Sequence, residues 1–132
     1  MLIGESKSRR ILIVEDEMLV ALNLEDMLVQ LGHTVVAMAA RIPEAMKLAA
    51  ESHIDLAILD LNLSGMSSFP VADVLRSRGI PFMFATGYGS RGLTESYRSE
   101  IVMAKPYGLL QLQNTINDVI SNCVPCDGIQ RS

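Results

Sequence analysis

Hydrophobic residues occur in five short runs along the chain, separated by longer segments in which they recur at helical spacing. The short runs predict strands at residues 10–14, 34–39, 55–60, 80–85 and 101–104. Residues 57–59 are all apolar and run directly into Asp60, which is typical of a strand buried on both faces of a parallel sheet. We therefore expect Asp60 at the carboxyl end of a central strand, where open α/β sheets bind their ligands.

The segments between the strands carry apolar residues three and four positions apart, which predicts amphipathic helices. The predicted helices occupy residues 17–31, 42–49, 70–78, 94–98 and 109–120. Gly32 suits the position after the first helix, and Pro43 and Pro70 suit the first turns of the next two. Strands that alternate with helices predict a parallel sheet with right-handed crossovers and helices on both faces.

Length and composition indicate one globular domain, expected at residues 10–122, between an N-terminal extension at 1–9 and a C-terminal tail at 123–132. Hydrophobic residues make up 49% of the chain, which excludes a disordered protein. The formal net charge is -4 and there is no basic stripe, so we expect no direct contact with DNA. The sequence lacks both a membrane-spanning apolar run and the apolar core of a signal peptide, so we expect a cytoplasmic location.

Two cysteines, Cys123 and Cys126, lie close together near the C-terminus. A redox pair of this spacing would open a helix after a strand, whereas these residues follow a predicted helix. A zinc site would need further ligands, and His33 and His53 lie far away in the sequence. We therefore favour unlinked thiols over a redox pair or half of a zinc site. Both histidines flank predicted loops, so we expect them to be solvated.

Polar side chains follow four of the predicted strands. Glu15 and Asp16 follow the first strand, Asp60 ends the third, Thr86 follows the fourth and Lys105 follows the fifth. Because the carboxyl ends of parallel strands meet at one edge of the sheet, these side chains should converge there. A single acid at a strand end is more often a helix cap or part of a solvated turn. The joint occurrence of acids, a hydroxyl and a lysine is harder to explain in that way.

Three carboxylates in one crevice repel one another unless a cation joins them. A divalent cation such as Mg²⁺ resolves this repulsion with carboxylate, water and phosphate oxygens as ligands. A carboxylate beside Mg²⁺ can attack phosphorus and form an aspartyl phosphate, and Asp60 is the best nucleophile because it stands alone on the central strand. Lys105 and Thr86 are the residue types that stabilise the oxygens of a transferred phosphoryl group.

These residues resemble the motifs of a response-regulator receiver domain of two-component signalling, over about residues 10–122. Residues 84–89, together with Lys105-Pro106-Tyr107, further resemble the FAT GUY subgroup. Gly89 stands where that subgroup's name has tyrosine, unless Tyr88 fills that role. The resemblance implies a flavodoxin-like (βα)5 fold, a doubly wound five-stranded parallel sheet of order 2-1-3-4-5. It also implies a stand-alone phosphoacceptor switch rather than an enzyme, with catalysis limited to its own phosphorylation and slow autodephosphorylation.

The resemblance also implies roles for individual residues. Asp60 would accept a phosphoryl group from a phosphohistidine on a sensor kinase or histidine phosphotransfer protein, and the signal would leave by contact with an unknown downstream protein or by phosphorelay. Asp16 and Asp60 would bind Mg²⁺ through their side chains, Asn62 through its backbone carbonyl, and Glu15 through water. Thr86 and Lys105 would contact the phosphoryl oxygens, and Lys105-Pro106 would be a cis peptide.

Val102 marks a departure, because many receivers have an aromatic switch residue three positions before the lysine. We expect the glycine-rich segment 87–92 to order on phosphorylation instead, with Tyr88 or Tyr107 moving. The alternative is that both tyrosines only pack at the surface or at the edge of the fold.

The sequence argues against three other classes of function. A Mg²⁺-dependent phosphohydrolase with an aspartyl phosphate would need a second acid two residues after the nucleophile, where Asn62 stands. A flavin-binding module would need a phosphate-cradling loop after the first strand, where acids stand. A degenerate receiver that binds partners without phosphorylation is disfavoured by the complete set of acids, hydroxyl and lysine.

Overall fold

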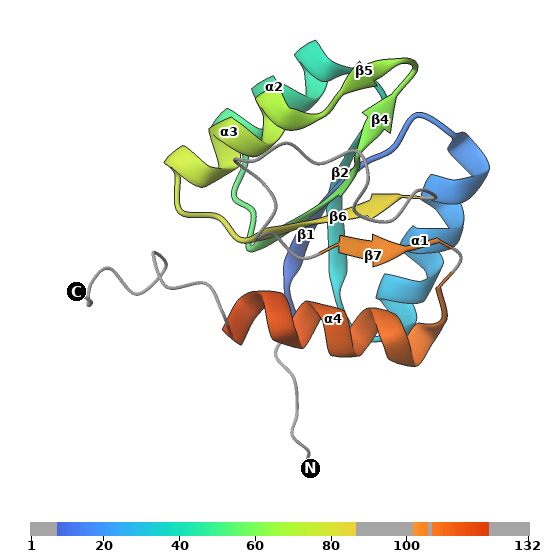
Figure 1. Cartoon of the computed structure of the whole chain (residues 1–132). Coiled ribbons are helices and arrows are strands. Elements are labelled where there is room, and N and C mark those ends of the chain that lie inside the picture. The colour runs from blue at the N-terminus through green and yellow to red at the C-terminus, as the bar shows by residue number, and fades with distance from the viewer. Residues whose placement is uncertain (1–7, 87–101, 106, 122–132) are drawn as a thin grey trace.

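The structure is a computed structural model that describes residues 8–86, 102–105 and 107–121. Its centre is a sheet of five parallel strands in the order β2-β1-β3-β6-β7 (Figure 1). The strands are β1 (Arg10–Val14), β2 (Thr34–Ala39), β3 (Leu56–Asp60), β6 (Phe82–Thr86) and β7 (Val102–Ala104). The predicted doubly wound order is confirmed, with each main strand within two residues of its expected bounds.

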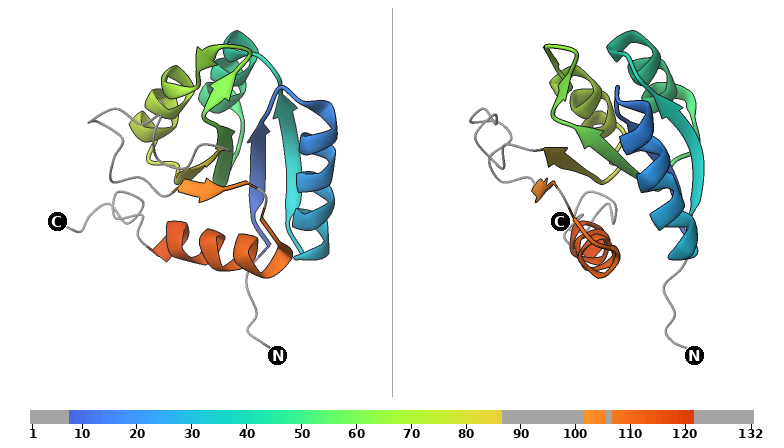
Figure 2. Two further views of the ribbon diagram at one scale, coloured as in Figure 1. Left: turned by 45° about the vertical axis from the view of Figure 1, so that its right-hand side comes forward. Right: turned by 90° about the vertical axis from the view of Figure 1, so that its right-hand side faces the viewer.

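Four helices of the described part cover the two faces of this sheet (Figure 2). They are α1 (Met18–Gln30), α2 (Ile42–Glu51), α3 (Phe69–Ser77) and α4 (Leu109–Ser121). Buried side chains of α2 and α3 share one core cluster, and those of α1 and α4 share the other. The fold therefore has three layers, with the sheet between two pairs of helices.

The central strands supply both cores because successive side chains of a strand point to opposite faces. Along β1, Ile11 and Ile13 pack with α1 and α4, whereas Leu12 packs with α2 and α3. On β3, Ile58 likewise packs with α1 and α4, and Leu59 packs with α2 and α3. Strands buried on both faces are apolar at every position, which explains why they were the strongest signal in the sequence.

The segment after Asp60 lies outside the predicted strands and helices, but it contains a short antiparallel ribbon. The ribbon is formed by β4 (Asn62–Leu63) and β5 (Met66–Ser67). Strands of two residues carry no periodicity that a sequence could reveal. The helix expected at 94–98 lies outside the described residues.

His33 was expected to be solvated, and this prediction was wrong. The side chain is buried, and its Nδ1 accepts a hydrogen bond from the backbone N–H of Arg9 at 3.1 Å. Its Nε2 lies 3.3 Å from Oε1 of Gln113 on α4. His53 is exposed, as expected. In the part of the chain that the structure describes, every helix is too short or too polar to cross a bilayer.

Candidate functional site

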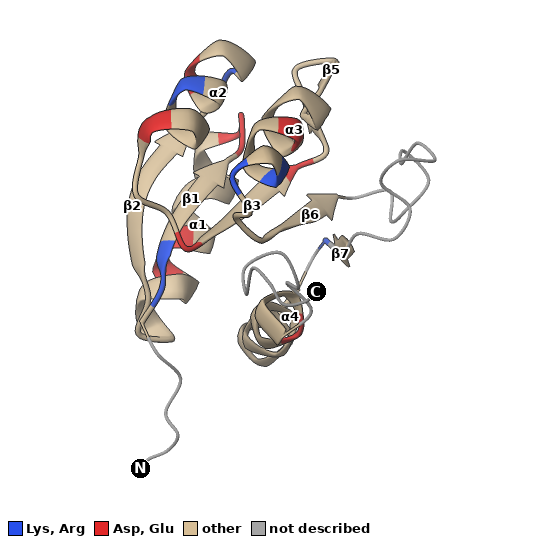
Figure 3. Ribbon diagram, turned by 90° about the vertical axis from the view of Figure 1, so that its left-hand side faces the viewer, with Lys and Arg blue, Asp and Glu red and all other residues tan. Residues whose placement is uncertain are grey.

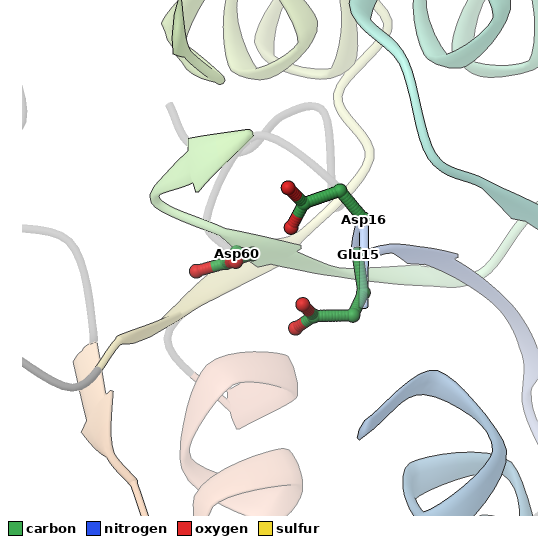
Figure 4. A group of neighbouring side chains, drawn as sticks. All are labelled: Glu15, Asp16 and Asp60. Carbon is green, nitrogen blue, oxygen red and sulfur yellow. The ribbon is translucent and has the colours of Figure 1, made fainter. Parts of the chain in front are cut away.

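Three acidic side chains meet at the carboxyl edge of the central strands. Glu15 and Asp16 follow β1, and Asp60 ends the neighbouring strand β3 (Figure 4). The register pairs Val14 with Leu59, so the next residues of the two strands, Glu15 and Asp60, lie at the same level. One carboxylate oxygen from each of the three acids lies within 4.8 Å of the others. The predicted convergence of the three acids is confirmed.

Lys105 brings a positive charge to these acids from the far end of the chain. Its Nζ donates a hydrogen bond to Oε1 of Glu15 at 2.9 Å and lies 3.6 Å from Oδ1 of Asp60. The backbone holds the lysine in place, because its N–H donates to the carbonyl oxygen of Thr86 at 2.9 Å. Lys105 directly follows β7, the outermost strand of the sheet, which lies next to β6 (Figure 3).

Thr86 is the last residue of β6, and it is buried. The register pairs Asp60 with Ala85, so Thr86 lies one residue beyond Asp60 at the same edge of the sheet. The hydroxyl, the lysine and the three acids therefore all lie at one edge, as predicted from the strand ends.

Asp16 is held by a residue that the sequence did not single out. Its Oδ2 accepts hydrogen bonds from the backbone N–H of Ser64 at 3.0 Å and from the Ser64 hydroxyl at 2.8 Å. The dipeptide Ser64-Gly65 was a sequence signal for a turn, but its contact with Asp16 depends on the tertiary fold. Asn62, at the start of the same ribbon, uses its side-chain oxygen to accept the N–H of Gly65 at 2.8 Å.

The electrostatics of the site make Asp60 a weaker acid than an ordinary aspartate. Burial, and then repulsion by Glu15, raise the pKa of Asp60 to about 6, although the charge of Lys105 and a backbone hydrogen bond from Asn62 oppose the shift. Burial acts to lower the pKa of Lys105, but the hydrogen bond to Glu15 and the charge of Asp60 outweigh it, so the pKa is raised. The site therefore holds more negative charge than its one ammonium group balances.

Tyr107 lies close enough to the acids for their charges to affect its pKa. The side chain is half-buried and packs against the core shared by α1 and α4. Burial raises its pKa to about 12, with smaller contributions from the charges of Glu15 and Asp60. Tyr88, the segment 87–92, Pro106 and the two cysteines lie outside the described residues.

Comparison with known proteins identifies the family. Residues 11–117 match the response regulator receiver domain family. The chain belongs to this family. Over 101 residues this receiver is 40% identical to the phyllosphere-induced regulator PhyR of Methylorubrum extorquens, an alignment that covers 74% of this chain and 38% of PhyR. The similarity to response regulators thus extends over most of the sequence.

Solved structures support the same assignment. The solution structure of SdrG from Sphingomonas melonis superposes on this receiver with a TM-score of 0.78 and 38% identity, over 88% of this chain and 99% of SdrG. The BeF3-activated conformation of SdrG from Pseudomonas melonis gives a TM-score of 0.74 and 38% identity, over 84% of this chain and 95% of that one. The flavodoxin-like receiver fold is therefore confirmed. The receiver spans only 38% of the length of its curated relative PhyR.

Proposed function

We propose that this receiver accepts a phosphoryl group on Asp60 from a phosphohistidine donor in a Mg²⁺-dependent reaction. The observation that carries the proposal is the placement of Asp60 at the carboxyl edge of β3, beside Glu15, Asp16 and the ammonium of Lys105. The proposed donor is a sensor histidine kinase or a histidine phosphotransfer protein. The modified receiver then acts on a downstream protein by contact or passes the group on.

The chemistry of the donor set fits a hard divalent cation. Three carboxylates lie together, and one of them, Glu15, is already paired with Lys105. In the described part of the chain, Asp16 is bonded only to neutral groups of Ser64 and has no basic partner. Asp16 and Asp60 would therefore hold Mg²⁺, with the backbone carbonyl of Asn62 as a further oxygen and Glu15 acting through water. When bound, the ion neutralises negative charge on the carboxylates and on the transferred group.

Each of the site residues Asp60, Lys105 and Thr86 then has a separate role in the transfer. Asp60, when ionised, attacks phosphorus through a carboxylate oxygen, the N–P bond of the donor breaks, and the histidine nitrogen keeps the electron pair. An acyl phosphate on Asp60 and a neutral histidine result, because the donor imidazole carries a proton on its other ring nitrogen when the N–P bond breaks. Lys105 and Thr86 stabilise the phosphoryl oxygens as negative charge shifts onto them. Positioning and charge stabilisation of this kind are the main requirements of phosphoryl transfer.

The proposed outcome is a switch and not turnover of a substrate. Asn62 stands two residues after the nucleophile, and an amide has no proton to give a leaving group as a carboxylic acid does. Phosphorylation replaces one carboxylate charge by close to two negative charges beside Lys105. Val102 is half-buried at the position where many receivers have an aromatic switch, so we propose Tyr107 or Tyr88 as the responding side chain. Amide exchange of residues 87–99 with and without a phosphoryl mimic tests that part, and unchanged protection rejects it.

Intact-mass measurement after incubation with acetyl phosphate and Mg²⁺ tests the main proposal. We expect one added phosphoryl group on the wild type, none on Asp60→Asn, and no addition when EDTA replaces Mg²⁺. Asp118→Asn is the matched control, because Asp118 is an exposed acid of α4. Equal phosphorylation of the Asp60→Asn variant would remove Asp60 from its role.

A further inference from the structure

Two hydrogen bonds from one residue fix a single oxygen of Asp16. The backbone N–H and the hydroxyl of Ser64 both donate to Oδ2, at 3.0 Å and 2.8 Å. Within the described residues, no donor is bonded to Oδ1 of Asp16. The carboxylate is thus anchored by one oxygen while the other is available to a ligand. The anchor joins positions 48 residues apart, so it depends on the tertiary fold.

The backbone of Ser64 shows that this contact is built into the ribbon. Ser64 has φ +52° and Gly65 has φ +87°, and they join β4 and β5 as a two-residue hairpin loop. Positive φ at both central residues is the pattern of a type I′ turn. Ser64 is the one non-glycine residue with positive φ among those described, and this conformation is strained for a serine. The turn directs both donors of Ser64 toward Asp16.

We propose that Ser64 is a positioning residue that presents Asp16 to Mg²⁺. The inference rests on the proposed function, in which Asp16 is a metal ligand. Mg²⁺ demands near-ideal geometry, and the terminal torsion of an aspartate has broad preferences, so a free Asp16 would sample many orientations. Hydrogen bonds from outer residues to metal ligands orient them, and their removal typically lowers metal affinity by about 10–100-fold. Ser64 has the position and the donors for that task.

Asn62 gives the ribbon a second connection to the same ion. Its side chain holds the turn by accepting the N–H of Gly65, and its backbone carbonyl is the proposed third protein ligand. The ribbon thus carries one proposed ligand and orients another. Ser67 ends β5 and Ser68 directly precedes α3, so the ribbon leads straight into this helix.

Isothermal titration calorimetry with Mg²⁺ alone tests the proposal, on the full chain without any phosphoryl donor. We expect Ser64→Ala to raise the Kd about tenfold, the low end of the range because the backbone N–H bond remains. Ser64→Gly removes the same hydroxyl, and glycine adopts the positive φ without strain. Because the hydroxyl is lost in both variants, Ser64→Gly should weaken Mg²⁺ binding as much as Ser64→Ala does. Ser67→Ala is the matched control on the same ribbon, since its hydroxyl accepts the N–H of Phe69 and not Asp16.

The outcomes separate this inference from the function on which it rests. A wild type that binds no Mg²⁺ overturns the proposed function itself. A wild type that binds Mg²⁺ while Ser64→Ala and Ser64→Gly bind equally well overturns only the role of Ser64. Tighter binding by Ser64→Ala also overturns it, because the serine would then compete with the metal. Weaker binding by Ser64→Ala with full recovery in Ser64→Gly assigns the effect to the turn and rejects the hydroxyl.

Discussion

Lys105 is hydrogen-bonded to Glu15 and not to Asp60. Its ammonium lies 2.9 Å from Oε1 of Glu15, whereas Oδ1 of Asp60 is 3.6 Å away. Asp60, the proposed nucleophile, therefore lies near the ammonium group without forming a hydrogen bond to it. Glu15 thus holds the lysine beside the acidic group through this hydrogen bond.

The free energy of unfolding should depend on the ionisation of Asp60. Its pKa is about 6 in the folded protein, above the ordinary value of 3.8, so the folded state binds the proton more strongly. Without metal, this term stabilises the protein below pH 4 and is lost as the pH rises through about 6. We expect Asp60→Asn to be more stable than the wild type at pH 7 by about 1–2 kcal/mol, a figure discounted for partial exposure.

Urea unfolding in EDTA at pH 4 and pH 7 measures this difference, which should shrink at the lower pH. Asp118→Asn on the exposed face of α4 is the control and should show no such gain. A constant difference between Asp60→Asn and the wild type at both values would contradict the raised pKa.

Replacement of Lys105 should destabilise the metal-free protein. Lys105→Met keeps an unbranched side chain but removes the only cation that the described structure places beside Glu15 and Asp60. We expect a loss of about 1–3 kcal/mol at pH 7, because the buried Glu15 carboxylate loses a charged hydrogen bond. Urea unfolding measures the loss, and Mg²⁺ should restore part of it. Lys47→Met, on the exposed side of α2, should be neutral.

His33 predicts a second pH dependence, with the opposite sign. Burial, and to a smaller extent the charge of Arg9, lower its pKa below 6.5, although the hydrogen bond to Gln113 opposes the shift. The folded state therefore favours the neutral ring, and its contribution to stability is lost as the pH falls below about 6.5. Protonation also places a hydrogen on Nδ1, which accepts the N–H of Arg9.

Chemical denaturation of His33→Ala should show a loss of about 1–3 kcal/mol at pH 7.5, because the N–H of Arg9 loses its partner. The loss should be smaller at pH 5.5. The other histidine provides the control, since His53 is exposed and His53→Ala should be neutral at both values. An equal loss from His33→Ala at both pH values would show that the ring acts by packing alone.

Phe84 should be the most costly aromatic residue to truncate. It is fully buried and makes edge-to-face contacts with Phe69 and Phe82, at ring-centroid distances of 5.8 Å and 5.7 Å. Phe84→Ala should lower the free energy of unfolding by about 3–5 kcal/mol. Phe69→Ala, at a half-buried ring, should cost less, and urea unfolding compares the two. Equal losses would mean that the ring pair and not burial determines the cost.

The strand ends could be read from the sequence because β1 and β3 are buried on both faces. Their apolar runs stop where the chain leaves the sheet, so Glu15 and Asp60 stand out, and parallel topology places these ends together. The same logic located Thr86 and Lys105. These residues needed no knowledge of side-chain packing, only of strand bounds.

Contacts that depend on tertiary packing could not be read in this way. Ser64 reaches Asp16 across 48 positions through a turn with no periodic signal. His33 looks like a loop residue in the sequence, but α4 covers it through Gln113. Met66, exposed on the ribbon, gives no hint of strand pairing either. Local pattern specifies elements, whereas these contacts depend on how the elements meet.

The contact between Lys105 and Glu15 joins residues 90 positions apart, which directly follow the last and the first strand of the sheet. During synthesis the three acids are made early, whereas Lys105 is made only after all five strands of the sheet. A chain that stops before β7 would carry the nucleophile but not its lysine. The group of acids and lysine is therefore complete only in the fully folded chain, and if the proposed function is correct, truncated chains should not react with a phosphoryl donor.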